Sequence, residues 1–95
     1  FSSLMAGAKV GNHCFIETYC LVSHETTVGN NCMLHSGTML AGKTTVGKNC
    51  MFNFKSAAIN NIEICDNVTL GAFSSATKSI TKEGVYVGTP ARFLR

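Results

Sequence analysis

An apolar residue stands at every sixth position over most of this chain. The positions are Val10, Ile16, Val22, Val28, Leu34, Leu40, Val46, Phe52, Ala58, Ile64, Leu70 and Ala76. Apolar residues make up 45% of the sequence, so chance gives such a run in about one sequence in ten thousand, or below about one in a thousand over all six phases. A repeat of this kind predicts a chain wound from hexapeptides.

A second line of mostly small residues precedes the first by two positions. Its members are Ala8, Cys14, Cys20, Thr26, Cys32, Thr38, Thr44, Cys50, Ser56, Ile62, Val68 and Ser74. Residues two apart on a strand point to the same face, so both lines are expected to point inward. A bulky line beside a small one fills a narrow interior densely.

A longer period of eighteen residues lies over the hexads. The segment Val10-Gly-Asn-His-Cys-Phe recurs from Val28, from Val46 and, degraded, from Ile64. Three hexads therefore make one coil of an all-β parallel β-helix, with coils stacked at the ~4.8 Å strand spacing.

The eighteen-residue period also sets the domain plan. We expect corners at Gly11, Gly29 and Gly47, because glycine tolerates left-handed backbone conformations. Residues 1–81 then hold a little over four coils, and residues 82–95 form a short closing segment. No 3.6-residue periodicity persists for three turns, which excludes a helical fold.

Composition excludes several classes of function. The net charge of +3 is too small for a nucleic-acid-binding stripe, and no apolar run reaches the ~18 residues of a membrane span.

Four cysteines occupy the small inward position of the repeat, where a thiol behaves as a small hydrophobe: Cys14, Cys20, Cys32 and Cys50. Unpaired buried thiols favour a cytoplasmic location; a disulfide or zinc site is the alternative.

Three stretches resemble one known group of enzymes. They are Val22-Ser-His-Glu25, Leu40-Ala-Gly42 followed by Val46-Gly-Lys-Asn-Cys50, and Gly84-Val-Tyr-Val-Gly88-Thr-Pro90-Ala-Arg92. With the hexads, they resemble the left-handed β-helix hexapeptide-repeat acetyltransferases. The closest likeness is to bacterial N-acetyltransferases of nucleotide-linked amino sugars and to sialic acid O-acetyltransferases.

The resemblance implies a left-handed coil, a homotrimer, acetyl-CoA as co-substrate and no metal. It implies acetyl transfer to the amino group of a nucleotide-linked sugar, in bacterial surface-glycan or glycoprotein biosynthesis. It also implies a nucleotide-sugar-binding domain ahead of residue 1, which this chain does not contain. O-acetylation of sialic acid or another hydroxyl acceptor is an alternative, and a non-catalytic trimerisation scaffold is another.

The resemblance assigns His24 as general base and Glu25 as the residue that tunes it. The eighteen-residue period itself sets His24, Gly42 and Asn60 on one line, with His24 about 5 Å from Gly42. The Gly42 N–H is then a candidate oxyanion donor. Gly42, Asn60, Lys78 and Arg92 are the expected acetyl-CoA contacts, the two cations suiting its phosphates.

The other two histidines leave alternatives open. Family members often have a second histidine nine positions after the first, where this chain has Met33, and His35 is a possible substitute. Glu17 lies one coil from His35 and could pair with it. His13 falls in a ladder of corner asparagines. The three histidines lie on different lines, which argues against a shared metal.

One apolar stripe is expected on the outside of the prism. Phe15, Met33 and Met51 occupy the outward position on one face of successive coils. Exposed apolar stripes often form interfaces, so this one is a candidate trimer contact.

Overall fold

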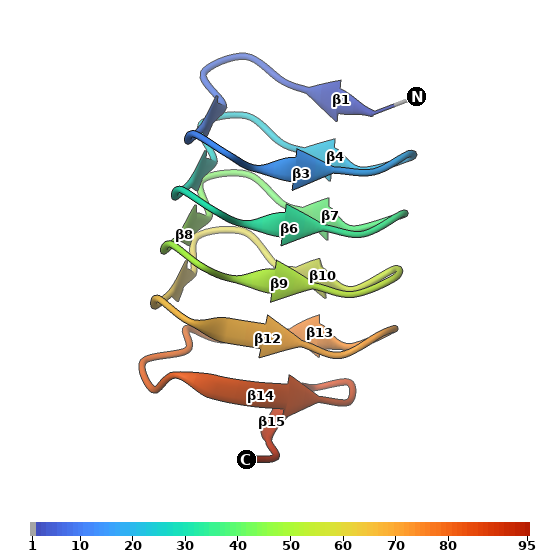
Figure 1. The fold of residues 1–95 in the computed structure, drawn as a ribbon, viewed down its shortest axis with the longest axis vertical. Coiled ribbons are helices and arrows are strands. Elements are labelled where there is room, and N and C mark those ends of the chain that lie inside the picture. Colours follow the sequence, from blue (N-terminus) through green and yellow to red (C-terminus); the bar gives the residue numbers. More distant parts are fainter. Residues whose placement is uncertain (1) are drawn as a thin grey trace.

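The chain is described here by a computed structural model that covers residues 2–95; Phe1, at the start of the expected β-helix, lies outside the described residues. Within that range the chain forms fifteen short strands and no helix (Figure 1). The strands are β1 (Ser3–Leu4), β2 (Lys9–Val10), β3 (Phe15–Ile16), β4 (Leu21–Val22), β5 (Thr27–Val28), β6 (Met33–Leu34), β7 (Met39–Leu40), β8 (Thr45–Val46), β9 (Met51–Phe52), β10 (Ala57–Ala58), β11 (Glu63–Ile64), β12 (Val68–Leu70), β13 (Ser75–Ala76), β14 (Gly84–Val87) and β15 (Arg92–Phe93).

The strands form three sheets, one for each face of a triangular prism. Sheet A has the order β1-β4-β7-β10-β13, sheet B the order β11-β8-β5-β2, and sheet C the order β15-β14-β12-β9-β6-β3. In Figure 1 the chain descends from the N-terminus, crosses the near side left to right in β3 and returns on the far side in β4. The coil is therefore left-handed, and the predicted fold class is confirmed.

The register between coils is eighteen residues over most of the stack. Leu21 pairs with Met39, and Met39 pairs with Ala57. The last coil is shorter: Val68 pairs with Gly84, sixteen residues further on. Ile80, bridged to Ile64, therefore takes the inward place that the six-residue count would give to Lys82.

Both predicted inward lines form the core. The bulky line is buried from Val22 to Ala76, and Leu34, Leu40, Phe52 and Leu70 have no exposed surface. The small line is buried from Cys20 to Ser74. The first coil is only partly buried at Val10 and Ile16, because no further coil within residues 2–95 lies beyond it.

Several polar side chains of the small line donate to backbone carbonyls of the coil that follows, whereas the buried Ser56 hydroxyl has no hydrogen-bond partner within residues 2–95. The Cys32 thiol donates to the Gly47 carbonyl at 3.1 Å, and the Thr44 hydroxyl donates to the Ile59 carbonyl at 3.0 Å. All five cysteines are free. Hydrogen bonding with Cys32, together with burial, raises the pKa of the Cys50 thiol. These contacts fit buried thiols that serve as small core residues.

The corners depart from the sequence-based explanation of the glycines. Left-handed backbone recurs at every sixth residue of the turns, as at Asn31 and Asn49 with φ of 60° and 59°, whereas Gly29 is not left-handed. A Cβ on Gly29 would lie 2.7 Å from the Gly47 carbonyl carbon. Glycine is needed there because stacked backbones approach closely, and the left-handed residue of this corner stands two positions later, at Asn31 and Asn49.

The segment 82–95 continues the stack before it turns back. β14 pairs in parallel with β12 as a further rung of sheet C. The chain then passes through a cis Thr89–Pro90 bond, and β15 pairs antiparallel to β14. The rings of Tyr86 and Phe93 meet edge to face at 5.5 Å, which secures the returning strand.

Candidate active site

The first candidate residues lie at the corner where sheet A meets sheet B. His24 and Glu25 fall between β4 and β5, and Gly42 follows β7 one coil further on. A Cβ on Gly42 would lie 2.7 Å from both Cε1 and Nε2 of His24. The imidazole ring therefore occupies the space of a side chain at position 42, and a glycine is required for it to lie there.

The Gly42 backbone N–H belongs to the residue against which this ring packs. Its neighbours are engaged along the stack: the Lys43 N–H donates to the His24 carbonyl at 3.0 Å, and the Asn61 N–H donates to the Gly42 carbonyl at 3.1 Å. Within residues 2–95 the Gly42 N–H itself has no hydrogen-bond acceptor. The corner thus holds an unpaired backbone donor beside an imidazole.

Glu25 and Lys43 complete a loose charged group around His24. Glu25 Oε1 lies 3.9 Å from His24 Nδ1 and also 3.9 Å from Lys43 Nζ. The side chains of His24 and Glu25 are 55% and 62% exposed. At that distance and exposure the carboxylate acts as a nearby charge and makes no hydrogen bond to the ring. The sequence analysis did not single out Lys43, although it stands eighteen residues after Glu25.

The expected acetyl-CoA contacts are not brought together in one cluster. Asn60 follows Gly42 on the same corner one coil further on, and Lys78, eighteen residues beyond Asn60, is exposed. Arg92 lies in β15 at the end of sheet C, away from the corner of sheets A and B. Arg92 is therefore separated from the line of His24, Gly42 and Asn60.

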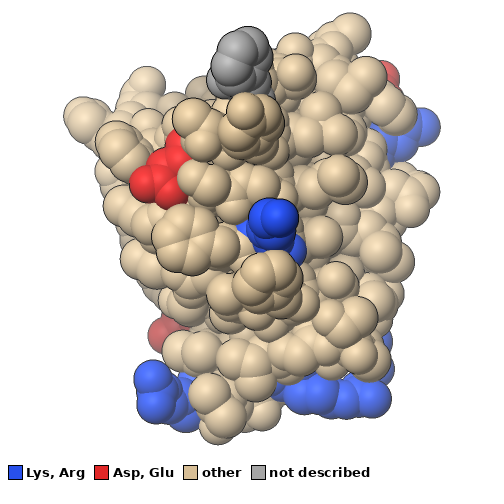
Figure 2. Space-filling model, turned by 90° about the vertical axis from the view of Figure 1, so that its right-hand side faces the viewer, with Lys and Arg blue, Asp and Glu red and all other residues tan. Residues whose placement is uncertain are grey.

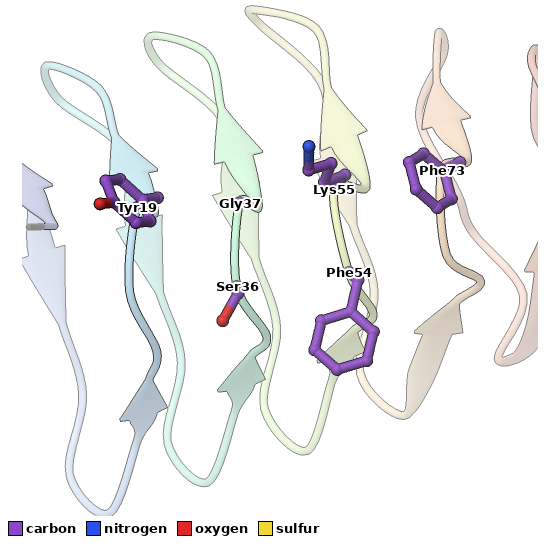
Figure 3. Close-up of a pocket in the computed structure, with 6 residues that line it drawn as sticks. All are labelled: Tyr19, Ser36, Gly37, Phe54, Lys55 and Phe73. Atoms are coloured by element: carbon purple, nitrogen blue, oxygen red, sulfur yellow. The ribbon is translucent and has the colours of Figure 1, made fainter.

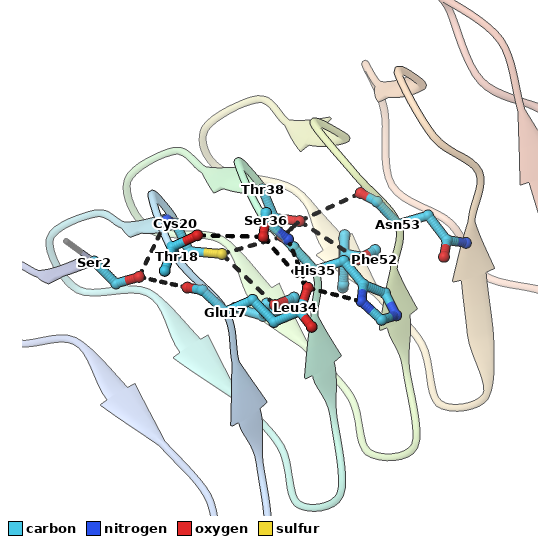
Figure 4. A network of polar contacts seen from close by, with 10 residues as sticks. All are labelled: Ser2, Glu17, Thr18, Cys20, Leu34, His35, Ser36, Thr38, Phe52 and Asn53. Carbon is cyan, nitrogen blue, oxygen red and sulfur yellow. Dashed lines mark hydrogen bonds and ion pairs between the residues drawn. The ribbon is translucent and has the colours of Figure 1, made fainter.

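A second imidazole and carboxylate pair forms at the corner of sheets C and A (Figure 4). His35 Nδ1 lies 3.0 Å from Glu17 Oε1, and the His35 side chain is only 20% exposed. The Ser36 N–H donates to the same oxygen at 3.1 Å. The hydrogen bond from His35 is the largest cause that lowers the pKa of Glu17, followed by the bonds from Ser36. This pairing was anticipated, and its geometry is tighter than that of His24 and Glu25.

The outward faces of the prism differ in polarity. The predicted apolar stripe is in register on sheet C, where Met33 pairs with both Phe15 and Met51. The sequence analysis missed a second stripe on sheet A, where Leu21 and Met39 stack. Sheet B presents polar and charged side chains instead, at Lys9, Thr27, Thr45 and Glu63. Two faces of the prism therefore suit packing and the third suits solvent.

No metal centre is evident in the described part of the chain. Among residues 2–95 no three histidine, cysteine or acidic side chains lie close enough together to hold an ion. The same residues include no helix long and apolar enough to cross a lipid bilayer.

Residues 7–42 match the family model described as bacterial transferase hexapeptide (six repeats). No curated protein sequence matches the chain. Many solved structures share its fold. One is a variant of GDP-perosamine N-acetyl transferase from Caulobacter crescentus in complex with CoA and GDP-perosamine, with a TM-score of 0.96 and 21% identity over 99% of this chain and 45% of that one.

Two further structures share the fold. The acetyltransferase domain of PglB from Neisseria gonorrhoeae has a TM-score of 0.95 and 20% identity over 98% of this chain and 45% of that one. A maltose O-acetyltransferase from Clostridium difficile has a TM-score of 0.86 and 21% identity over 99% of this chain and 64% of that one. The expected resemblance to hexapeptide-repeat acetyltransferases is thus confirmed for the fold. The chain spans slightly less than half the length of the first two structures.

Proposed function

We propose that this chain is the catalytic and acetyl-CoA-binding part of an acetyltransferase that acts on the amino group of a nucleotide-linked amino sugar. The observation that carries the proposal is the His24 imidazole against the Gly42 backbone, beside an N–H without an acceptor. A base and an oxyanion donor at one point are what acyl transfer to an amine requires. Proteins of the same fold have been solved with CoA and GDP-perosamine, or with acetyl-CoA.

The proposed reaction uses these two groups in sequence. The sugar amine attacks the thioester carbon, a C–N bond forms, and the carbonyl oxygen becomes an oxyanion that accepts a hydrogen bond from Gly42. His24 takes the proton that the nitrogen loses. The C–S bond then breaks, and the coenzyme leaves as a thiol after it receives that proton. No metal takes part in the scheme.

Glu25 has a minor part in this scheme. Its carboxylate lies 3.9 Å from His24 Nδ1 and is shared with Lys43 at the same distance. An exposed pair at this separation contributes little interaction energy. Glu25 therefore favours the imidazolium formed during the reaction only weakly, and its removal is expected to cost much less than removal of His24.

A homotrimer completes the proposed site. The apolar stripes on sheets C and A leave two faces of each prism to pack on neighbours, around a threefold axis. Acetyl-CoA would lie between prisms, near Asn60 and Lys78, with Arg92 reaching its phosphates from the far end of sheet C. The five free cysteines of this chain agree with the proposed cytoplasmic location. The nucleotide sugar would be held mainly by a domain ahead of residue 1.

A second candidate acceptor is a hydroxyl group. A maltose O-acetyltransferase shares the fold, and the same base and donor would serve an alcohol as well as an amine. A scaffold without catalysis is the remaining alternative. Calorimetry with acetyl-CoA separates the scaffold from both enzymes, because a scaffold has no affinity for the coenzyme. Turnover with a nucleotide-linked amino sugar, compared with sialic acid, separates the two enzymes.

Substitution of the two histidines tests the mechanism. His24→Ala is expected to lower turnover by about 10²–10⁴-fold, the usual contribution of a general base, with little change in acetyl-CoA affinity. His35→Ala is the matched control, since its imidazole lies at a different corner. Near-normal turnover in His24→Ala, with an inactive His35→Ala, would assign the base to His35.

A further inference from the structure

Lys43 is a cation at the proposed active site for which the reaction scheme has no role. It follows Gly42 directly, and its backbone N–H donates to the His24 carbonyl at 3.0 Å. Its ammonium Nζ lies 3.9 Å from Glu25 Oε1, the same distance that separates this oxygen from His24 Nδ1. The ammonium is therefore no further from the imidazole than the sum of those two distances, a separation that one sugar residue can span.

The ammonium of Lys43 is open to a ligand. In the described part of the chain Glu25 is the only acidic side chain that pairs with it, and 3.9 Å exceeds the length of a hydrogen bond. The Lys43 side chain is 59% exposed, so this pair contributes little energy and can be exchanged for another anion. The N–H groups of the ammonium thus remain available as donors.

The corner backbone keeps this lysine on the outside of the prism, beside the base. Glu25, Lys43 and Asn61 stand at the same place in successive coils, and all three are exposed with left-handed backbone. Gly42, by contrast, is buried against the His24 ring. An acceptor that brings its amine to His24 therefore meets the Lys43 side chain at the same corner.

The coenzyme is a poor source of an anion for Lys43. In acetyl-CoA the whole pantetheine chain separates the phosphates from the thioester, so a cation next to the thioester does not reach them. Figure 2 shows basic side chains gathered at the end of the stack that holds the C-terminus. Lys82, Arg92 and Arg95 are exposed in that closing segment. An anion that meets Lys43 therefore belongs to the acceptor.

Lys55 shows what a corner lysine lacks when no base stands beside it. It has the same left-handed backbone, with φ of 55° against 60° at Lys43. Figure 3 shows it at a hollow between sheets C and A, which is lined by Tyr19, Ser36, Gly37, Phe54, Lys55 and Phe73. That lining contains no imidazole and no acidic side chain. The combination of a cation, a base and an unpaired backbone N–H thus belongs to the corner of sheets A and B.

We propose that Lys43 is a specificity-determining residue that binds an anionic group carried by the acceptor close to its reacting amine. This inference rests on the proposed acetyl transfer at His24. A carboxylate on the amino sugar and a phosphate of the linked nucleotide share the required chemistry, because each accepts charge-assisted hydrogen bonds from an ammonium. A neutral acceptor makes no such contact and is the poorer substrate.

Three acceptors built on one amino sugar test the proposal and separate the two sources of the anion. They are the neutral methyl glycoside, the methyl glycoside of the corresponding amino uronate, and the nucleoside-diphosphate-linked sugar. In the full-length protein, Lys43→Gln is expected to lower kcat/KM about tenfold, mainly through KM, for an anionic acceptor and much less for the neutral one. Lys43→Arg, which keeps the charge, should retain most of the preference.

The pattern of losses in Lys43→Gln decides the outcome. A loss with the amino uronate assigns the contact to a carboxylate, and a loss with the nucleotide-linked sugar assigns it to a phosphate. An equal loss with all three acceptors, or no loss with any, overturns the proposal. Lys48→Gln is the matched control, because Lys48 is an exposed lysine between β8 and β9, at the corner of sheets B and C, and every kcat/KM value should stay unchanged.

Calorimetry with CoA present distinguishes failure of this inference from failure of the proposed function. If the wild type acetylates none of the three acceptors, the proposed function is wrong. The binding measurement still tests Lys43, since one of the two anionic acceptors should bind Lys43→Gln about tenfold more weakly than the wild type. Unchanged affinity for both anionic acceptors in the folded variant refutes the role of Lys43.

Discussion

Replacing Gly42 with alanine tests whether the placement of His24 determines the rate. Gly42 is not left-handed, so alanine fits its backbone without strain. The new methyl group would lie 2.7 Å from Cε1 and Nε2 of the imidazole, against 3.4 Å for ordinary contact. The exposed ring must therefore retreat by about 0.7 Å. A misplacement on the order of 1 Å costs up to about 10²-fold in rate, so we expect a 10- to 100-fold loss of turnover.

The assay is the initial rate of acetyl transfer to a nucleotide-linked amino sugar in the full-length protein. Gly71→Ala is the matched control, because Gly71 is also not left-handed and its added Cβ would crowd Val87 Cγ1 at a similar distance, 2.9 Å, with Ser74 Oγ at 3.4 Å and no contact with His24. Gly42→Ala should keep the urea midpoint of the wild type, since an exposed ring can move aside at little cost. Turnover above half of the wild-type value, in a folded Gly42→Ala variant, refutes the reasoning.

Three further changes have definite expected outcomes. Phe52→Ala removes a side chain with no exposed surface and should lower the free energy of unfolding by about 3–5 kcal/mol in urea titration. Glu17→Gln weakens the contact with His35. The pKa of Glu17 is lowered from 4.5 in the folded protein, so the wild type should be more stable than the variant above pH 4.5, and the two stabilities should converge as the pH falls below the folded-state pKa. Urea titrations from about pH 3 to 6 measure this difference. Met33→Glu with Met51→Glu should dissociate the proposed trimer in sedimentation equilibrium, whereas an intact trimer of unchanged stability would remove the sheet C stripe as its interface.

The repeat allowed the buried residues and the neighbours along each corner to be predicted from the sequence. The bulky inward residues recur every six positions, and each was expected to be buried; the expectation failed only at the open first coil, at Val10 and Ile16. Counting by eighteen likewise placed His24 beside Gly42 and Glu17 beside His35. Such predictions succeed because in a stacked coil a sequence separation translates directly into a spatial neighbour.

Counting failed where the coil length changed. The two-residue deletion after Ala76 placed Ile80 in the core and left Lys82 outside. In the six-residue count, the charged Lys82 ends the apolar line without indicating that Ile80 replaces it. The same limit applies to Arg92, which lies beyond that deletion on a strand that reverses direction. Its distance from the His24 corner could not be obtained by counting coils.

The sequence by itself determined the prism, its inward lines and the neighbours along each corner, since these depend only on period and residue size. Tertiary structure decided what the side chains do once they are neighbours. His35 reaches Glu17 at 3.0 Å, while His24 and Glu25, adjacent in the chain, stay 3.9 Å apart. Glu25 follows His24 in the chain and takes the left-handed backbone of the corner, with φ of 57°. Glu17 and His35 come from stacked coils, and contact depends on side-chain direction as well as on separation.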